Sequence, residues 1–326
     1  MTMKKINNWC KNKIQRIRER VCAPVVFKMM DVAGIRRHLP FTHTGDDAQE
    51  LIYNKLMSGK PCMIGRIGAM EIRNMEGVIN QNCSLWKKIK LFLTLHQTGQ
   101  SKKIQAMWHN IEEHLYDNAF YEKFTARMLE DIKELDVFAS WRWEEINVLP
   151  SYDKDVIMLD DLEPFFSARP WTRALAGKKV LVVHPFDKAV KLQYSQREHL
   201  FQNREILPDF ELINYQPFYW GIRENQDKTL DYFRNLECMK QEIAAIDFDV
   251  ALIAAGPFGF SLAAEIKRNG KQAVVVGGVL QMFFGIKGAR WNAQDKYRNL
   301  YNEYWIRPGD EYKPQYFAKI DGGCYW

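Results

Sequence analysis

The sequence predicts an α/β protein with a doubly wound, mostly parallel sheet, and the clearest signal lies between residues 249 and 291. Asp249–Ala255 is an apolar run of strand length, Ser261–Asn269 carries apolar residues at helical spacing, and Gln272–Val276 is a second, valine-rich run. A strand, a helix and a strand in this order form a βαβ unit, whose parallel strands are buried on both faces. A further apolar run, Val180–Val183, precedes another helical pattern. This alternation is typical of Rossmann-like folds.

The remaining elements extend this fold toward the N-terminus. A helix is expected at Asp46–Met57, and the apolar run Cys62–Ile64 predicts a strand that turns through glycines into another helix. Further strands are expected at Val137–Ala139, Val156–Leu159 and Leu212–Ile213, and further helices at Leu85–His96, Lys102–Tyr116, Ala119–Leu135, Trp171–Leu175, Lys191–Phe201 and Leu230–Ile246. We therefore expect a basic helical arm over 1–43 and a single α/β domain over 44–326, with a helical insertion at about 84–135.

The positive charge of the chain is concentrated at its N-terminal end. Residues 1–37 hold ten Lys or Arg and two acidic residues, a net charge of +8, so the rest of the chain carries −2 of the total of +6. A body without excess cations argues against a nucleic-acid surface. Met3–Val21 has the pattern of a basic amphipathic helix, with Trp9 and Ile14 among its apolar residues. Such a helix suits either an anionic membrane surface or packing on the body with a solvated basic face.

Targeting and cysteine patterns favour a reduced compartment. The N-terminal stretch has no apolar region typical of a secretory signal, and no apolar run reaches about 18 residues. The six cysteines show neither C-x-x-C nor zinc-ligand spacing. We expect a cytoplasmic protein, either free or peripheral on the inner face of the membrane through residues 1–37. The oligomeric state is left open.

Glycines and cations at the predicted strand ends suggest a phosphate site. The turn that follows Asp249–Ala255 leads into a helix whose first N–H groups and dipole favour an anion, and glycines let the backbone approach a ligand closely. Two cations in the glycine-broken segment further on can clamp a diphosphate. The alternative is that the glycines only make tight turns and the cations are solvated. The residues concerned are Gly256, Pro257, Gly259, Gly277, Gly278, Lys287 and Arg290.

Two motifs are similar, in order and separation, to the signatures of a known family. Arg66-Ile67-Gly68-Ala69-Met70-Glu71 resembles an arginine-x-glycine-aspartate-glycine-glutamate motif. Ala254-Ala255-Gly256-Pro257, followed after the helix by Gly270-Lys271-Gln272-Ala273, resembles a glycine-proline turn and a glycine-x-glutamine-alanine strand start. The chain thereby resembles the GT-D fold (DUF1792-like) bacterial glycosyltransferases over roughly residues 45–290.

The resemblance implies transfer of a sugar from a nucleotide sugar, usually a UDP-sugar, to a glycan or lipid-linked glycan acceptor in cell-surface polysaccharide or glycoprotein biosynthesis. It ties the aspartate and glutamate of the first motif to a divalent metal, Mn²⁺ or Mg²⁺, and to the diphosphate. Arg66 and Gly68 of that motif are expected at the donor phosphates. Ala69 stands where the family has the aspartate, so Glu71 is the one carboxylate of the motif left for a metal. The alternatives are another glycan-modifying transfer, such as that of pyruvyl or phosphate, and a non-catalytic subunit that binds a nucleotide sugar or glycan.

The acceptor side of such a transfer needs further residues. The acceptor hydroxyl needs a partner for its proton, and the candidates near predicted strand ends are Glu71, His184 and Asp187. His184 can equally be a strand-end histidine that caps or packs. Gln193 and Arg197, one helical turn apart in the helix expected after Val180–Val183, are predicted to face the acceptor.

Overall fold

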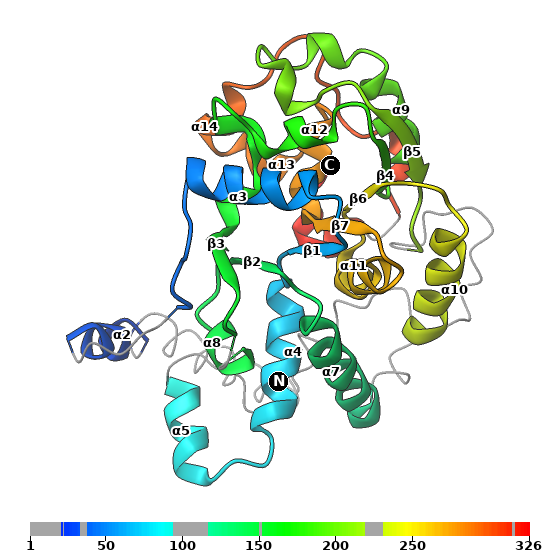
Figure 1. Cartoon of the computed structure of the whole chain (residues 1–326). Helices are drawn as coiled ribbons and strands as arrows, with labels where there is room; N and C mark the ends of the chain where they lie inside the picture. The colour runs from blue at the N-terminus through cyan, green and yellow to red at the C-terminus, as the bar shows by residue number, and fades with distance from the viewer. Residues whose placement is uncertain are drawn as a thin grey trace, which may run out of the picture.

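The computed structural model describes residues 21, 23–32, 38–93, 117–149, 152–218, 231–314 and 317–326. Within these residues, seven parallel strands form one sheet in the order β3-β2-β1-β7-β6-β4-β5 (Figure 1). The strands are β1 (Cys62–Gly65), β2 (Val137–Ser140), β3 (Asp155–Met158), β4 (Lys179–Val183), β5 (Glu211–Tyr215), β6 (Val250–Ile253) and β7 (Gln272–Val275). The predicted α/β class with a parallel sheet is confirmed.

Helices cover both faces of the sheet, so it is doubly wound (Figure 1). Side chains of α3, α9 and α12 contribute to one hydrophobic core, and those of α4, α7, α10 and α11 to the other. The helices are α2 (Ala23–Val32), α3 (Asp46–Met57), α4 (Ala69–Asn80), α5 (Leu85–Leu93), α7 (Asn118–Ile132), α8 (Glu145–Val148), α9 (Asp187–Tyr194), α10 (Tyr232–Ala244), α11 (Gly259–Arg268), α12 (Leu280–Phe283), α13 (Ala289–Asn292) and α14 (Asp295–Arg298).

The continuous apolar runs of the sequence follow from burial on both faces. In β4, Val180 and Val182 enter one core while Leu181 and Val183 enter the other. All four residues of β1, β6 and β7 are buried. A central parallel strand between two helical layers therefore has no polar face, and its sequence shows no alternation.

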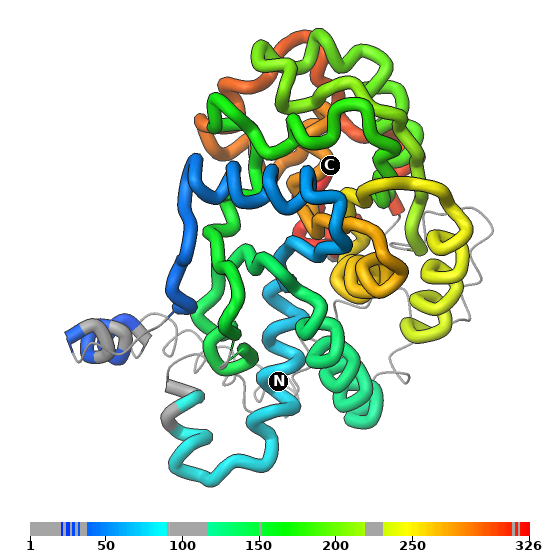
Figure 2. Tube along the Cα trace, viewed as in Figure 1, coloured from blue at the N-terminus to red at the C-terminus, as the bar shows by residue number. Residues whose placement is uncertain are grey.

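The C-terminal tail returns to the segment that follows β7, as the red end of the trace shows (Figure 2). The backbone N–H of Arg290 donates to the carbonyl of Cys324 (3.0 Å), and that of Ala289 donates to the carbonyl of Trp326 (3.1 Å). Trp326 is buried and packs edge-on against Phe186, which directly precedes α9. These contacts bring residues 321–325 to the carboxyl edge of the sheet.

Two expectations about helices need correction. The helix expected at Lys191–Phe201 begins earlier, at Asp187, and ends at Tyr194. Gln196 leaves the helical region (φ −117°, ψ 25°), and a separate 3₁₀ turn follows at Arg197–His199. The helix expected at Trp171–Leu175 is a 3₁₀ turn.

Several predicted segments lie outside the described residues. These are Met3–Val21 except for its last residue, Lys102–Tyr116, and the end of Leu85–His96 beyond Leu93. None of the helices in the described ranges is long and apolar enough to cross a membrane.

Candidate functional site

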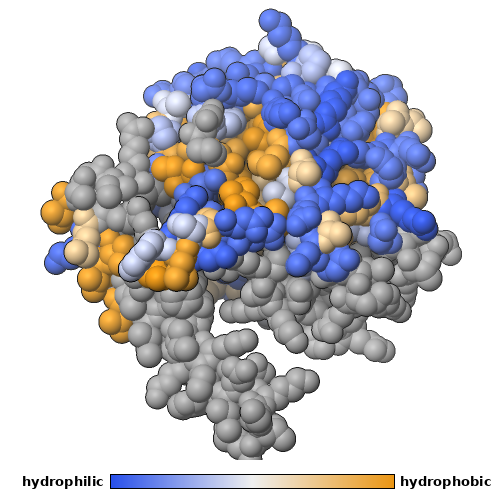
Figure 3. All heavy atoms as spheres, turned by 90° about the horizontal axis from the view of Figure 1, so that it is seen from below, coloured by the Kyte–Doolittle hydropathy of each residue, from blue (hydrophilic) through white to orange (hydrophobic). Residues whose placement is uncertain are grey.

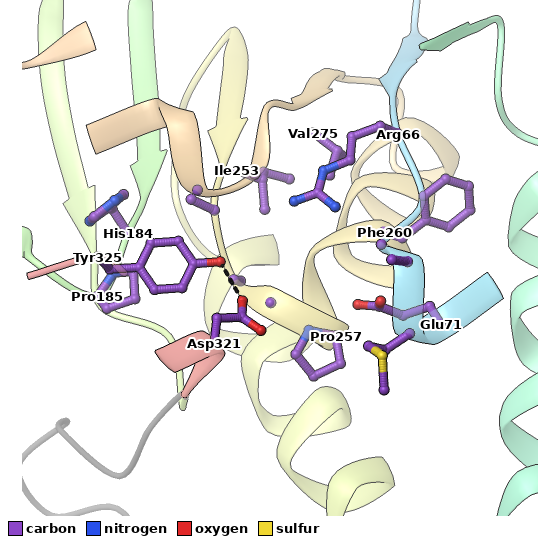
Figure 4. Close-up of a pocket in the computed structure, with 18 of the residues that line it drawn as sticks. Arg66, Glu71, His184, Pro185, Ile253, Pro257, Phe260, Val275, Asp321 and Tyr325 are labelled. Carbon is purple, nitrogen blue, oxygen red and sulfur yellow. Dashed lines mark hydrogen bonds between the residues drawn. The ribbon is translucent and has the colours of Figure 1, made fainter. Parts of the chain in front are cut away.

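A pocket lies at the carboxyl ends of four central strands. Arg66 follows β1, His184 follows β4, Gly256 lies after β6 and Gly277 lies after β7, and all four residues line the pocket. Such a crevice at the carboxyl ends of parallel strands is where open α/β sheets bind ligands. In Figure 4, Arg66 and Glu71 lie on one side of this space, His184 and Tyr325 lie on the other, and Asp321 and Pro257 lie between them.

Arg66 is directed into the pocket by a glycine at its side. Gly277 has a left-handed backbone (φ 76°), and a Cβ at this position would lie 2.7 Å from Nε and 2.8 Å from Cζ of Arg66. The ring of Trp141 lies 6.0 Å from Arg66 Cζ, and its indole N–H donates to the carbonyl of Ile67 (3.1 Å). The predicted donor residues Arg66 and Gly277 are therefore in direct contact, although 211 positions separate them in sequence.

Substitution of Gly277 tests whether this position of Arg66 matters. If Arg66 binds a nucleoside diphosphate in this pocket, Gly277→Ala is expected to displace the guanidinium and weaken UDP binding by about tenfold or more, because a charged contact to phosphate would be lost. Gly270→Ala is the matched control: Gly270 is also left-handed (φ 80°), but nothing lies within 4 Å of its added Cβ. Both variants carry a strain of about 1 kcal/mol from alanine in a left-handed backbone. Calorimetric titration with UDP should separate them; equal affinities would show that Arg66 does not hold the diphosphate.

Glu71 lies in the first turn of α4, and its carboxylate faces the pocket (Figure 4). Its Oε1 would lie 2.7 Å from a Cβ on Gly68, so this carboxylate needs a glycine in the motif. Burial raises the pKa of Glu71, whereas the Arg66 charge and the backbone N–H groups of Glu71 and Met70 oppose the rise. The carboxylate is thus held between the positive end of its own helix and the Arg66 guanidinium.

Asp321 and Tyr325 complete the pocket from the C-terminal tail, and the sequence interpretation missed both. The Tyr325 hydroxyl donates to Asp321 Oδ2 (2.9 Å), and Arg290 Nη2 lies 3.4 Å from the same oxygen. Among the described residues, Asp321 is the one non-glycine with a left-handed backbone (φ 48°). A Cβ on Gly278 would strike the Tyr325 ring, so the glycine pair after β7 seats the tail as well as Arg66. The signal available in the sequence was Asp321-Gly322-Gly323, a composition that favours left-handed turns.

His184 lines the pocket in a neutral state. Its Nδ1 accepts the Phe186 backbone N–H (2.9 Å), which leaves the ring proton of the neutral imidazole on Nε2. Burial lowers the pKa of His184 to about 3. The ring therefore offers the pocket an N–H donor at neutral pH, and its role as a base stays a prediction with less support than that of a carboxylate.

The glycine-proline turn is partly in the pocket and partly beneath it. Gly256 has a left-handed backbone (φ 51°), and it lines the pocket together with Pro257. The carbonyl of Pro257 accepts a hydrogen bond from the buried Tyr232 hydroxyl (3.1 Å), which fixes the turn. Gly259 does not line the pocket; a Cβ there would lie 3.3 Å from Ile253 Cγ2, so this glycine allows α11 to pack closely on β6.

Four other predicted site residues do not line the pocket. Gln193 is fully buried and donates to the carbonyls of Gly285 (3.1 Å) and Tyr304 (3.0 Å). Arg197, beyond the end of α9, pairs with Asp209 (2.6 Å). The two residues are therefore not on an acceptor side of this pocket.

The remaining two, Asp187 and Lys287, also do not line the pocket. Asp187 opens α9 and accepts a hydrogen bond from Gln216 Nε2 (3.2 Å). The Lys287 ammonium lies 5.3 Å from the centre of the Tyr301 ring. Of the two cations expected in this segment, Arg290 is the one at the pocket.

The acidic residues of the pocket suit a cation that is shared with a ligand. No group of three or more His, Cys, Asp or Glu that could enclose a metal ion is found among the described residues. Glu71 and Asp321 line the pocket together, and the Asp321 charge contributes to the raised pKa of Glu71. Mg²⁺ bound with phosphates commonly uses only one or two protein carboxylates, so these two residues fit such an ion.

Comparisons with known proteins add one structural likeness. No protein-family model and no curated protein matches the chain. A solved structure described as the selenomethionine-substituted domain of unknown function 1792 (DUF1792) is 14% identical and covers 73% of this chain and 78% of its own, with a TM-score of 0.32. This is the family that the two sequence motifs resemble. At this TM-score the likeness carries no argument about the site.

Proposed function

We propose that the chain is a glycosyltransferase that takes a sugar from a nucleotide sugar, best a UDP-sugar, and passes it to a hydroxyl of a glycan or lipid-linked glycan. The supporting observation is that Arg66 and Arg290 line one pocket with the left-handed turns at Gly256 and Gly277. Guanidinium groups bind phosphate in a bidentate manner, and glycine turns bring backbone N–H groups close to it. The motif resemblance supports the same donor class.

The proposed sugar transfer requires groups in the pocket that stabilise negative charge and a group that accepts a proton. The acceptor oxygen bonds to the anomeric carbon while the bond from that carbon to the phosphate oxygen breaks, and the nucleoside diphosphate leaves with the electron pair. Arg66 and Arg290 can offset the charge that develops on this leaving group. The acceptor proton passes to a carboxylate, and Asp321 suits this role because the Tyr325 hydroxyl and the Arg290 guanidinium both contact its Oδ2, which leaves Oδ1 for the proton.

A divalent metal fits this scheme through Glu71 and Asp321, which would hold it together with the donor diphosphate. When bound, it would neutralise charge on the leaving phosphates. Ala69 lines the pocket at the motif position where a second carboxylate would stand. The metal requirement is therefore a part of the proposal that needs its own test. That substitution also favours the second candidate, a non-catalytic subunit that binds a nucleotide sugar.

A panel of nucleotide sugars tests the proposal. Thermal unfolding of the wild-type protein with UDP-, GDP-, ADP- and CMP-sugars, each with and without Mn²⁺, should show stabilisation by one donor class. A ligand at about 100 times its dissociation constant adds about 2.7 kcal/mol to the free energy of unfolding. Release of sugar or nucleotide from the stabilising donor then separates an enzyme from a binding subunit. Stabilisation by none of the donors would contradict the proposal.

A further inference from the structure

The most exposed large hydrophobic side chains lie on two helices, α2 and α5. Among the described residues, the highest exposed fractions belong to Val32 (84%), Trp86 (82%), Leu85 (72%) and Met29 (66%). Both helices lie toward the lower left of the molecule in Figure 1, and the view from below shows hydrophobic side chains at the surface along its left edge (Figure 3). Exposed apolar side chains scattered singly need no explanation, but a concentration on two helices does.

Helix α5 has a buried side and an exposed side. Leu85, Trp86 and Ile89, here called the α5 face, are exposed by 72%, 82% and 42%. At about 100° of rotation per residue they share one side of the helix, whereas Leu91 falls near the opposite side. Leu91 is buried. The helix therefore has a buried leucine on one side and turns an apolar face outward.

Helix α2 also carries exposed apolar residues on one face. Val25, Met29 and Val32, here called the α2 stripe, are spaced as one helical face, and together with Lys28 they line one shallow hollow. Val25 is 57% exposed. The stripe lies within the arm of residues 1–37, which carries a net charge of +8.

The chemistry of the α5 face indicates what covers it. The sequence of α5, LWKKIKLFL, contains three lysines and no acidic residue, and the Lys87 side chain is exposed. A tryptophan beside leucine and isoleucine with flanking lysines is the composition of a helix that lies in a lipid interface. A second copy of the chain suits this face less well, because a two-fold contact would place lysines against lysines.

We propose that the α5 face and the α2 stripe dock this protein on an anionic lipid surface. Each lysine near such a surface adds to the attraction, and the apolar side chains enter the boundary between head groups and acyl chains. Helix α4 leads directly from the pocket to α5: its first residues line the pocket, and its 12 residues end at Asn80, five positions before Leu85. At 1.5 Å per residue, α4 spans roughly 18 Å between the pocket and the turn that leads into α5.

Vesicle binding of single-residue variants tests the proposal on the full chain. Wild type should co-sediment with phosphatidylcholine vesicles that contain phosphatidylglycerol, and much less with phosphatidylcholine alone. Leu85→Glu and Trp86→Glu should each weaken binding to the anionic vesicles by at least about tenfold. Leu192→Glu is the matched control, because Leu192 is 59% exposed on α9, at the other end of the molecule (Figure 1).

Three results of the vesicle measurements would overturn the proposal. They are absence of wild-type binding to anionic vesicles, unchanged binding of Leu85→Glu and Trp86→Glu, and an equal loss in Leu192→Glu. Unchanged binding of the two α5 variants would assign any membrane contact to the N-terminal arm alone. Sedimentation without lipid covers the second-copy alternative: a wild-type dimer that Leu85→Glu converts to a monomer would show that the α5 face is a protein interface. These measurements contain no nucleotide sugar, so their outcome does not depend on whether the proposed activity is correct.

Discussion

Glu71→Gln should lower sugar transfer by about 100-fold or more, the usual scale for the loss of a positioned acid–base or electrostatic group. The substitution keeps the size of the side chain, and its amide oxygen can still accept from the backbone N–H groups at the start of α4. Only the charge that faces the pocket beside Arg66 is removed. Turnover of the stabilising donor at saturating concentration is the measurement.

The stability of the same variant separates function from structure. Because burial raises the pKa of Glu71 above its ordinary value of 4.5, the folded state binds this proton more tightly than the unfolded state does. The contribution of Glu71 to the free energy of unfolding is therefore full below pH 4.5 and declines as the pH rises through the folded pKa. Glutamine has no such decline, so the stability of Glu71→Gln relative to wild type should rise with pH.

Urea unfolding of both proteins at pH 5 and pH 8 measures this difference, with transfer assayed on the same preparations. A variant that is inactive yet at least as stable as wild type at pH 8 would identify Glu71 as a functional charge. A variant that is destabilised but retains the turnover of its folded fraction would show that Arg66 and Glu71 only fix the turn between β1 and α4.

The sequence was informative where the structure depends on local pattern. The apolar runs of β1, β6 and β7 end in glycine-containing turns, and parallel strands bring their carboxyl ends to one edge. For this reason Arg66, Glu71, Gly256 and Gly277 could be expected to meet although they are far apart in the chain. This expectation did not require the order of the strands in the sheet, because all strands of a parallel sheet have their carboxyl ends at the same edge.

The sequence was less informative where the direction of a side chain depends on the rotation of its helix, or where a segment packs against residues distant in sequence. Gln193 was expected at the pocket because it lies in the helix that follows the strand Val180–Val183, but in the structure it faces Gly285 and Tyr304. The tail has no periodic pattern, and its position depends on bonds to Ala289 and Arg290 that no local rule predicts. For this reason the sequence analysis did not predict that aromatic residues of the tail line the pocket.

Asp321→Asn should lower sugar transfer by about 100-fold while it leaves the fold intact. Asparagine tolerates the left-handed backbone that Asp321 adopts, so the substitution adds little strain. The lost ion pair with Arg290 is between side chains that are 45% and 41% exposed, and such pairs contribute little to stability. Burial raises the pKa of Tyr325, so its hydroxyl stays protonated and can still donate to the amide oxygen.

Ligand binding distinguishes the possible roles of Asp321. Removal of a negative charge beside a diphosphate pocket should leave UDP affinity without metal unchanged or higher, because like-charge repulsion is reduced. If Asp321 accepts the acceptor proton, transfer falls with or without Mn²⁺, whereas the loss of a metal ligand would also weaken Mn²⁺-dependent UDP binding. Asp310→Asn is the matched control, since Asp310 lies in the tail with its side chain 94% exposed and pairs only with Lys313 among the ion pairs of the described residues. Full transfer by Asp321→Asn would remove this residue from the chemistry and leave Glu71 as the one carboxylate that lines the described pocket.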